Sequence, residues 1–180
     1  MNLSPLVFMT LLFAMGCGAP HPTTCTGGPV VGAADTHCGA GFVTVDKSAC
    51  TPSGTMTAGD YGDALYGTSG YDDDCKYAVS YTVEPICNDE GVTFVVRATY
   101  AADGTPVAHA KVRLDAFLSD THPAPNSGAT TVEPTPGTYT IGPVKLDAAG
   151  QWTVRYHFFE GCADAVDSPH GHVAFFVSVP

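Results

Sequence analysis

A two-residue alternation of apolar and polar side chains, repeated through the second half of the chain, constrains its fold more than any other feature. The alternating runs are rich in β-branched and aromatic residues, which favour strands, and none has the period of a helix. Turns rich in Gly, Asp, Asn and Pro separate them at short intervals. The runs predict an all-β fold, an antiparallel immunoglobulin-like β-sandwich. The predicted strands are 77–83, 92–100, 110–118, 138–146, 151–159 and 172–179.

The rest of the chain is too poor in apolar residues to follow this pattern. Residues 119–136 are polar and interrupted by proline and glycine, so we expect a loop or a ragged sheet edge there. Residues 23–75 are dense in Gly, Thr, Ser, Pro and Ala, and such a segment buries too little to order itself. We expect it to be irregular and braced by disulfides, after a tether at 17–22 and before the sandwich domain at 76–180.

An apolar run from Leu6 to Cys17 has the length of a signal-peptide core and is too short to span a membrane. Because Gly16 and Cys17 close this run, the segment resembles the lipobox of bacterial lipoproteins, in which that cysteine is lipidated and becomes the mature N-terminus. We therefore expect a signal peptide at 1–16 and a lipid on Cys17. The alternative is an ordinary secretory peptide cleaved near Ala19. Both place the protein outside the cytoplasm, in the periplasm or at the cell surface.

The cysteine count agrees with an oxidising compartment. Setting Cys17 aside leaves an even set of cysteines that can form three disulfides, and their connectivity stays open. If 77–83 is a strand, the chain from Cys75 to Cys87 extends about 40 Å, so these two cannot be partners. As a provisional pairing we expect Cys75 with Cys162. The full set is Cys25, Cys38, Cys50, Cys75, Cys87 and Cys162.

Charge and missing motifs exclude several classes of function. The chain has 18 acidic and 7 basic residues and a net charge of −11, which opposes binding to nucleic acid and to anionic lipid headgroups. Contact with a membrane is therefore expected through the lipid anchor alone. The sequence also lacks a Gly-x-Ser-x-Gly or His-Glu-x-x-His motif and leaves no cysteine over as a nucleophile, so we expect no enzyme activity.

Ordered motifs across residues 92–160 point to a known family. They are Gly104-Thr105-Pro106-Val107, Ala110-Lys111-Val112, Pro136-Gly137-Thr138-Tyr139, Gly142-Pro143-Val144-Lys145-Leu146 and Gly150-Gln151-Trp152-Thr153-Val154. In this order they resemble the YtkA-like family of small extracytoplasmic β-sandwich domains. The resemblance implies a sandwich and a link to extracytoplasmic metal handling, chiefly of copper. Where the family carries Met-Pro followed by histidine, this chain has His122-Pro123 without the methionine.

Three histidines near the C-terminus form a candidate metal site. Alternation places His157 on the outer face of its strand, and His170 and His172 on the outer face of the next. If these two strands pair as a hairpin, the three imidazoles project to the same side, close enough to share an ion. Imidazole suits Zn and Cu, and a lack of free thiolates favours Cu(II) or Zn. His122 is a further donor if its loop folds back, and the alternative is that all of these histidines are simply solvated.

The run Asp72-Asp73-Asp74, just before Cys75, concentrates three carboxylates. Carboxylates are ligands that Ca²⁺ prefers, but the spacing matches no known calcium loop, and neighbouring side chains of an extended segment point in opposite directions. We expect instead a solvated acidic turn, pinned by Cys75.

Together these features predict a lipid-anchored extracytoplasmic binding protein. The specific hypothesis is a copper or zinc site at His157, His170 and His172. The alternative is a structural or protein-interaction module of the cell envelope, with another envelope protein as its partner and no metal site.

Overall fold

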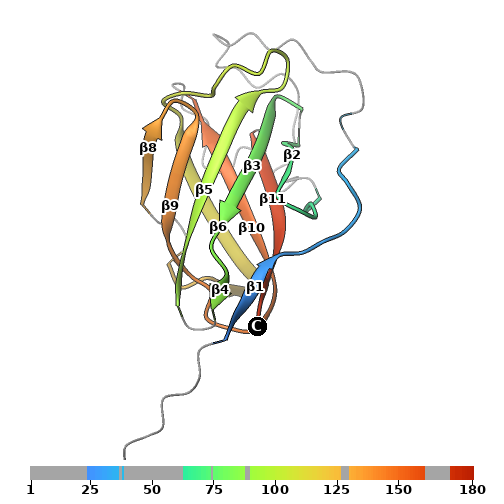
Figure 1. Cartoon of the computed structure of the whole chain (residues 1–180), viewed down its shortest axis with the longest axis vertical. Coiled ribbons are helices and arrows are strands. Elements are labelled where there is room, and N and C mark those ends of the chain that lie inside the picture. The colour runs from blue at the N-terminus through green and yellow to red at the C-terminus, as the bar shows by residue number, and fades with distance from the viewer. Residues whose placement is uncertain are drawn as a thin grey trace, which may run out of the picture.

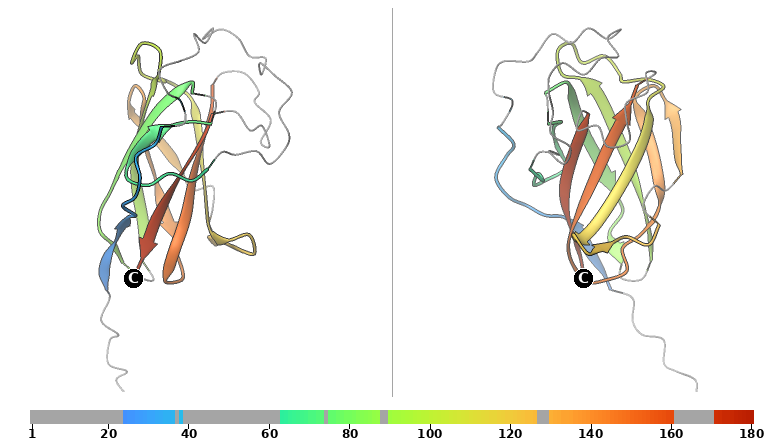
Figure 2. Two further views of the ribbon diagram at one scale, coloured as in Figure 1. Left: turned by 90° about the vertical axis from the view of Figure 1, so that its right-hand side faces the viewer. Right: turned by 180° about the vertical axis from the view of Figure 1, so that it is seen from behind.

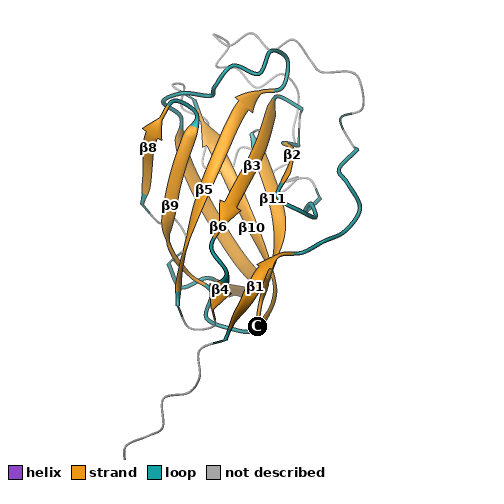
Figure 3. Cartoon of the chain, viewed as in Figure 1, coloured by secondary structure: helices purple, strands orange, loops and turns teal. Residues whose placement is uncertain are grey.

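The computed structural model describes residues 24–36, 38, 63–73, 75–87, 90–126, 130–160 and 171–180. All regular secondary structure in these residues is β-strand (Figure 3). No helix in this part of the chain has the length and apolar character needed to cross a membrane. The strands are β1 (Cys25–Pro29), β2 (Ser69–Tyr71), β3 (Tyr77–Val83), β4 (Ile86–Cys87), β5 (Gly91–Tyr100), β6 (Lys111–Ser119), β7 (His122–Pro123), β8 (Thr131–Thr135), β9 (Thr138–Lys145), β10 (Gly150–Phe159) and β11 (His172–Val179).

The strands form two sheets that pack face to face (Figures 1 and 2). One sheet has the order β4-β1-β11-β10-β6-β7, and the other has the order β2-β3-β5-β9-β8. Neighbouring strands run antiparallel in both sheets. The prediction of an all-β antiparallel sandwich is therefore confirmed.

The six strands predicted from alternation are the long strands of the sandwich. Along β5 every second residue from Val92 to Tyr100 is buried, while Thr93, Val95 and Arg97 are exposed. This pattern follows because successive side chains of a strand point to opposite faces, and only one face meets the other sheet. Observed and predicted bounds of the six long strands agree to within one residue.

Aromatic side chains hold the two sheets together at the centre of the core. The Tyr156 ring of β10 lies 6.1 Å from the Phe94 ring of β5 and 6.3 Å from the Phe175 ring of β11. Tyr81 of β3 reaches across to Phe175, with ring centroids 5.0 Å apart. Such tilted and edge-on contacts add to the stabilisation from burying large apolar areas.

The described residues of the region from 23 to 75 include two short strands. β1 lies between β4 and β11, with Gly28 opposite Ser178, and β2 is the edge strand beside β3. Leu65 adds to this pairing, since its N–H donates to the Ala174 carbonyl and its own carbonyl accepts from the Phe176 N–H. Existing strands supply backbone partners at these places, so even a largely irregular segment with few apolar residues can pair locally.

The predicted ragged edge at 119–136 also contains two short strands. β7 pairs with the end of β6, and β8 pairs with β9, each with an irregular register. Both are edge strands, the position at which proline is tolerated in a sheet.

The two disulfides of the described residues tie the N-terminal region to the sandwich. Cys25 bonds to Cys87, and Cys38 bonds to Cys75. The prediction that Cys75 and Cys87 have different partners is confirmed, whereas the provisional pairing of Cys75 with Cys162 was wrong. The pairing depends on which segments lie side by side in the folded protein. The alternation of apolar and polar residues does not reveal this. Of the other cysteines, Cys17, Cys50 and Cys162 lie outside the described residues.

The acidic run before β3 is structural rather than solvated. Asp72 is fully buried, and its carboxylate accepts a hydrogen bond of 2.6 Å from the Tyr77 N–H. Asp73 accepts a hydrogen bond of 3.1 Å from the His172 N–H and so joins the turn to β11. The turn is indeed pinned by the disulfide of Cys75, but its first carboxylate caps the start of β3 instead of facing water. Asp74 lies outside the described residues.

Gly137, in the turn between β8 and β9, is predicted to tolerate no side chain. Its φ is +71°, and a Cβ there would lie 2.7 Å from the carbonyl oxygen of Ala98. We expect Gly137→Ala to lower the free energy of unfolding by about 3 kcal/mol, from left-handed strain and overpacking together. Urea unfolding followed by circular dichroism measures the loss.

Gly104 is a matched control for this substitution. Its φ is +70°, but no atom lies within 4 Å of a Cβ built there. Gly104→Ala should therefore lose only about 1 kcal/mol, the cost of the backbone conformation. Equal losses for the two variants would contradict the close approach at Gly137.

Candidate functional site

Two of the three predicted histidines are direct cross-strand neighbours. His157 of β10 lies opposite His172 of β11 in the register of the hairpin, and their ring centroids are 3.7 Å apart at an interplanar angle of 44°. The Phe159 ring lies 3.8 Å from the His157 ring on the same strand. The predicted pairing of the last two strands is therefore confirmed. His170 lies outside the described residues.

The expectation that these histidines lie on an exposed strand face was wrong. His157 and His172 are each only 2% exposed. Segment 63–66 pairs with β11 through Leu65, and together with Asp73 and residues 33–36 it lines a cavity of about 320 Å³ beside His172. An outer strand face is solvated only where no other segment covers it, and alternation alone does not show which faces are covered.

The present geometry of the pair does not fit a shared metal ion. Two imidazoles bound to one tetrahedral ion at about 2.0–2.1 Å hold their ring centroids roughly 5 Å apart, whereas the centroids of these tilted rings are 3.7 Å apart. The described residues contain no group of three or more His, Cys, Asp and Glu side chains that could hold an ion. The described part of the site is a closely packed, tilted pair of imidazoles.

His122 does not approach the histidine pair. It lies beside Ser119 at one end of β6, while His157 lies opposite Arg113, six residues along that strand, or about 20 Å away at 3.3 Å per residue. Its Nε2 is 2.9 Å from a carboxylate oxygen of Asp147, and this hydrogen bond lowers the pKa of Asp147. The idea that the His122 loop folds back to the site was therefore wrong.

A half-buried carboxylate joins three strands near the histidine pair. Glu160, directly after β10, accepts hydrogen bonds from the phenols of Tyr77, at 2.6 Å, and Tyr100, and its carboxylate is 2.6 Å from Lys76 Nζ. Burial raises the pKa of Glu160, but hydrogen bonds from the ammonium and the two phenols outweigh it, so the pKa is lowered. Burial, followed by these hydrogen bonds, raises the pKa of both tyrosines beyond their usual range.

This cluster predicts a pH-dependent contribution to stability. We expect Glu160→Gln to lower the free energy of unfolding near pH 7 by on the order of 2 kcal/mol, because hydrogen bonds to a charged group are lost. The folded-state pKa of Glu160 lies below its unfolded value. Its contribution is therefore complete above the unfolded pKa of about 4.3 and disappears as the pH falls through the folded value.

Urea unfolding of the wild type and of Glu160→Gln at a series of pH values tests this prediction. The difference between the two proteins should be full at pH 7 and should shrink below about pH 4. Glu84→Gln, at an exposed glutamate between β3 and β4, is the control and should change little. A difference for Glu160→Gln that stays constant down to about pH 3 would contradict the assignment.

A groove of about 750 Å³ lies over the outer face of β2, β3 and β5. Ala78 and Ser80 of β3 lie on its floor, where their small side chains leave the sheet surface low. Arg97 and Thr99 of β5 line one side. The segment 32–35 and the side chains of Tyr66 and Tyr71 line the other.

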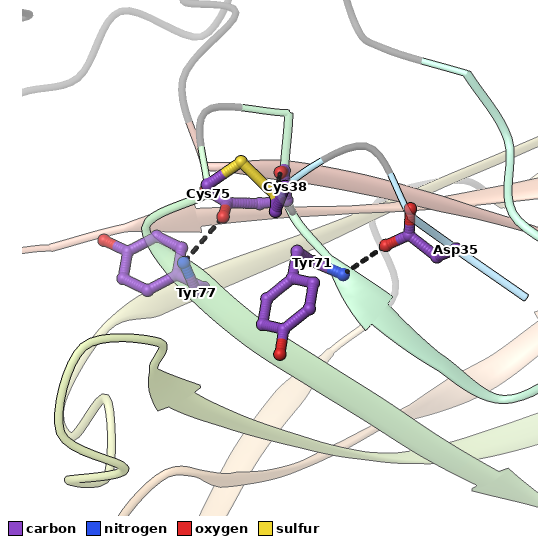
Figure 4. Close-up of a disulfide and its surroundings, with 6 residues drawn as sticks. Asp35, Cys38, Tyr71, Cys75 and Tyr77 are labelled. Atoms are coloured by element: carbon purple, nitrogen blue, oxygen red, sulfur yellow. Dashed lines mark hydrogen bonds between the residues drawn. A yellow bond between two sulfur atoms is a disulfide. The ribbon is translucent and has the colours of Figure 1, made fainter. Parts of the chain in front are cut away.

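Tertiary contacts hold the wall at 32–35 against the sandwich (Figure 4). The Tyr71 N–H donates a 3.0 Å hydrogen bond to the carboxylate of Asp35, and the disulfide from Cys38 to Cys75 anchors the chain just beyond. Gly32 lies against the Tyr66 ring, so close that a Cβ there would be 2.2 Å from Cγ of that ring. In Figure 1 this segment runs from β1 past the edge strand β2.

Sequence reasoning singled out none of the residues that line the groove. Asp35, Tyr66 and Arg97 belong to segments far apart in the chain, and no motif connects them. The small residues at Ala78 and Ser80 were visible as part of a strand, but only the placement of segment 32–35 above that strand turns them into a floor.

The sequence model of the YtkA-like family matches residues 72–157. This range begins in the acidic turn before β3 and ends at His157 of β10, so it contains most of the sandwich. Comparisons with curated proteins and with solved structures find no significant match. Both the disulfides and the family match indicate an extracytoplasmic protein. Residues 72–157 thus match the YtkA-like family, and the sandwich continues beyond this range with β11 and with the N-terminal strands β1 and β2.

Proposed function

We propose that this protein is a binding module of the cell envelope, held at a membrane by a lipid on Cys17, that acts without catalysing a reaction. The groove over β2, β3 and β5 is its ligand site. The observation that carries this proposal is the fixed position of segment 32–35, which forms one wall of the groove. The Cys38–Cys75 disulfide and the hydrogen bond from the Tyr71 N–H to Asp35 hold this segment above the sheet. The volume of about 750 Å³ is that of a small-molecule site.

Filling the groove tests its role. Ser80→Trp places an indole on the floor, whereas Thr82→Trp places one two residues further along the same face of β3, outside the groove. A mixed library of peptides, sugars and small organic acids, screened by amide chemical shifts, should give ligands that shift resonances of Ser80 and Arg97. These ligands should bind Thr82→Trp but not Ser80→Trp. If no compound binds, or if every ligand binds both variants equally, the groove is not the site and the alternative of a structural module is favoured.

The lipid anchor has a separate test. When the full chain is expressed in a bacterium fed with radioactive palmitate, the wild type should incorporate label and partition with membranes. Cys17→Ser should incorporate none and appear in the soluble fraction, because a cysteine thiol carries the diacylglyceryl group. A wild type that remains unlabelled would support the ordinary secretory peptide cleaved near Ala19. Residues 1–23 lie outside the described residues.

Binding of copper or zinc at His157, His170 and His172 stays a prediction, and it requires the closely packed rings of His157 and His172 to move apart. Titration of the protein with Cu(II) and Zn(II) by calorimetry tests it. His172→Gln should weaken binding at least tenfold, since one of three ligands is lost. His122→Gln, at the other end of the sandwich, should leave the affinity unchanged. Weak and equal binding by the wild type and His172→Gln would overturn the metal hypothesis.

A further inference from the structure

The groove over β2, β3 and β5 contains an arginine that forms no ion pair with a described residue. The chain has three arginines. Arg113 and Arg155 both pair with the carboxylate of Asp115, whereas the side chain of Arg97 forms no salt bridge or hydrogen bond with any other described residue. This side chain is exposed and lines the groove. A guanidinium in this setting is suited to bidentate hydrogen bonding with a single carboxylate from solution.

Hydroxyl side chains lie beside Arg97 on the same face of the sheet (Figure 1). Arg97 of β5 lies opposite Ser80 of β3, and Ser80 lies opposite Ser69 of β2. Directly opposite residues of an antiparallel pair have Cβ atoms about 4.5–5.5 Å apart. Thr68 and Thr99 also line the groove. The hydroxyls of these serines and threonines form no hydrogen bond with other residues that the structure describes, and each can donate to or accept from a hydroxyl of a ligand.

The opposite side of the groove offers an aromatic surface. Tyr66 lines the groove there and is 39% exposed. A sugar ring has C–H groups on its faces, and an aromatic ring with a polar tip can pack against such a surface while its hydroxyl stays in water. Asp35 also lines this side, where its carboxylate accepts the Tyr71 N–H. It has no role in the recognition described below.

We propose that the groove binds a sugar acid, whose carboxylate lies at Arg97 and whose hydroxyls bond to the serines and threonines of the groove. This inference rests on the proposed role of the groove and specifies its ligand class. A single guanidinium matches one negative charge, and the net charge of −11 opposes the binding of polyanionic chains. The expected ligand is therefore a single uronic acid rather than an acidic polysaccharide.

Titration with methyl glucuronide, followed by amide chemical shifts, tests the proposal. This ligand should bind the wild type. Methyl glucoside, which has a hydroxymethyl group in place of the carboxylate, should bind about tenfold more weakly, because the charge-assisted hydrogen bonds to Arg97 are lost. Arg97→Gln should weaken binding of the glucuronide by a similar factor and leave the weak binding of the glucoside unchanged, since either change removes the same interaction. Acetate, a carboxylate without hydroxyls, should bind at least about tenfold more weakly than the glucuronide.

Arg113→Gln, on the outer face of the other sheet, is the matched control and should bind methyl glucuronide as the wild type does. The proposal is overturned if methyl glucuronide does not bind, or if Arg97→Gln binds it with wild-type affinity. It is also overturned if acetate binds as tightly as methyl glucuronide, because the hydroxyls then contribute nothing. If library compounds still distinguish Ser80→Trp from Thr82→Trp in these cases, the groove remains a ligand site and only the assignment to a sugar acid falls.

Discussion

Replacing Trp152 with alanine should lower the free energy of unfolding by about 4 kcal/mol, since the side chain is lost and the cavity collapses only in part. Trp152 is 0% exposed, and its indole Nε1–H donates a 2.8 Å hydrogen bond to the Ala148 carbonyl. Its ring also forms an edge-on contact with His122 at 5.5 Å. Urea unfolding must be followed by circular dichroism, because the chain has a single tryptophan.

Two controls separate packing from the hydrogen bond. Trp152→Phe keeps most of the ring and loses the indole N–H, so it should lose about 1–2 kcal/mol. Val132→Ala, at a side chain that is 59% exposed on the edge strand β8, should change stability by less than about 0.5 kcal/mol. A loss for Trp152→Ala no larger than that for Val132→Ala would show that Trp152 is not part of the core.

Removing the disulfide between Cys38 and Cys75 should both destabilise the protein and open the groove. The two cysteines are 37 residues apart, and closing a loop of that length is worth about 4 kcal/mol at 25 °C in the chain-entropy model. The Cys38→Ser, Cys75→Ser double variant should lose stability by that order. Because Cys38 anchors segment 32–35, the variant should also lose affinity for groove ligands under conditions in which it remains folded.

The second disulfide is a control for the groove. The Cys25→Ser, Cys87→Ser double variant opens a loop of 62 residues and should lose a similar amount of stability. It leaves Cys38–Cys75 in place, so the folded variant should keep its affinity for groove ligands. Peptide mapping without reduction should recover both crosslinks from the wild type. A Cys38→Ser, Cys75→Ser variant with the wild-type midpoint would show that this disulfide does not form.

The long strands could be predicted because local chemistry decides them. Residues such as Val92, Phe94 and Val96 are apolar at every second position, and a strand with one buried face requires that period wherever it sits in a sandwich. The core positions of β10, among them Trp152 and Tyr156, follow by the same reasoning and are buried as expected. Short edge strands such as β2 and β7 carry too few residues for a period to appear.

The candidate site could be predicted only in part. That His157 and His172 lie side by side follows from a hairpin of the last two strands, which periodicity indicates. Their burial does not follow from it, because segments distant in sequence, such as 63–66, pack against this end of β11. For the same reason the groove could not be predicted. Its charged residues Asp35 and Arg97 come to line one groove only in the folded structure.

The residues alone predict the all-β class, the six long strands and an oxidising compartment. These are properties of local composition and period, and neighbouring residues are enough to define them. The pairing of Cys38 with Cys75, the burial of the histidines and the groove between Asp35 and Arg97 become visible only in the folded structure. All three features depend on the path of a segment that has few apolar residues. That path is set by the backbone hydrogen bonds and disulfides that the segment forms with the folded sandwich.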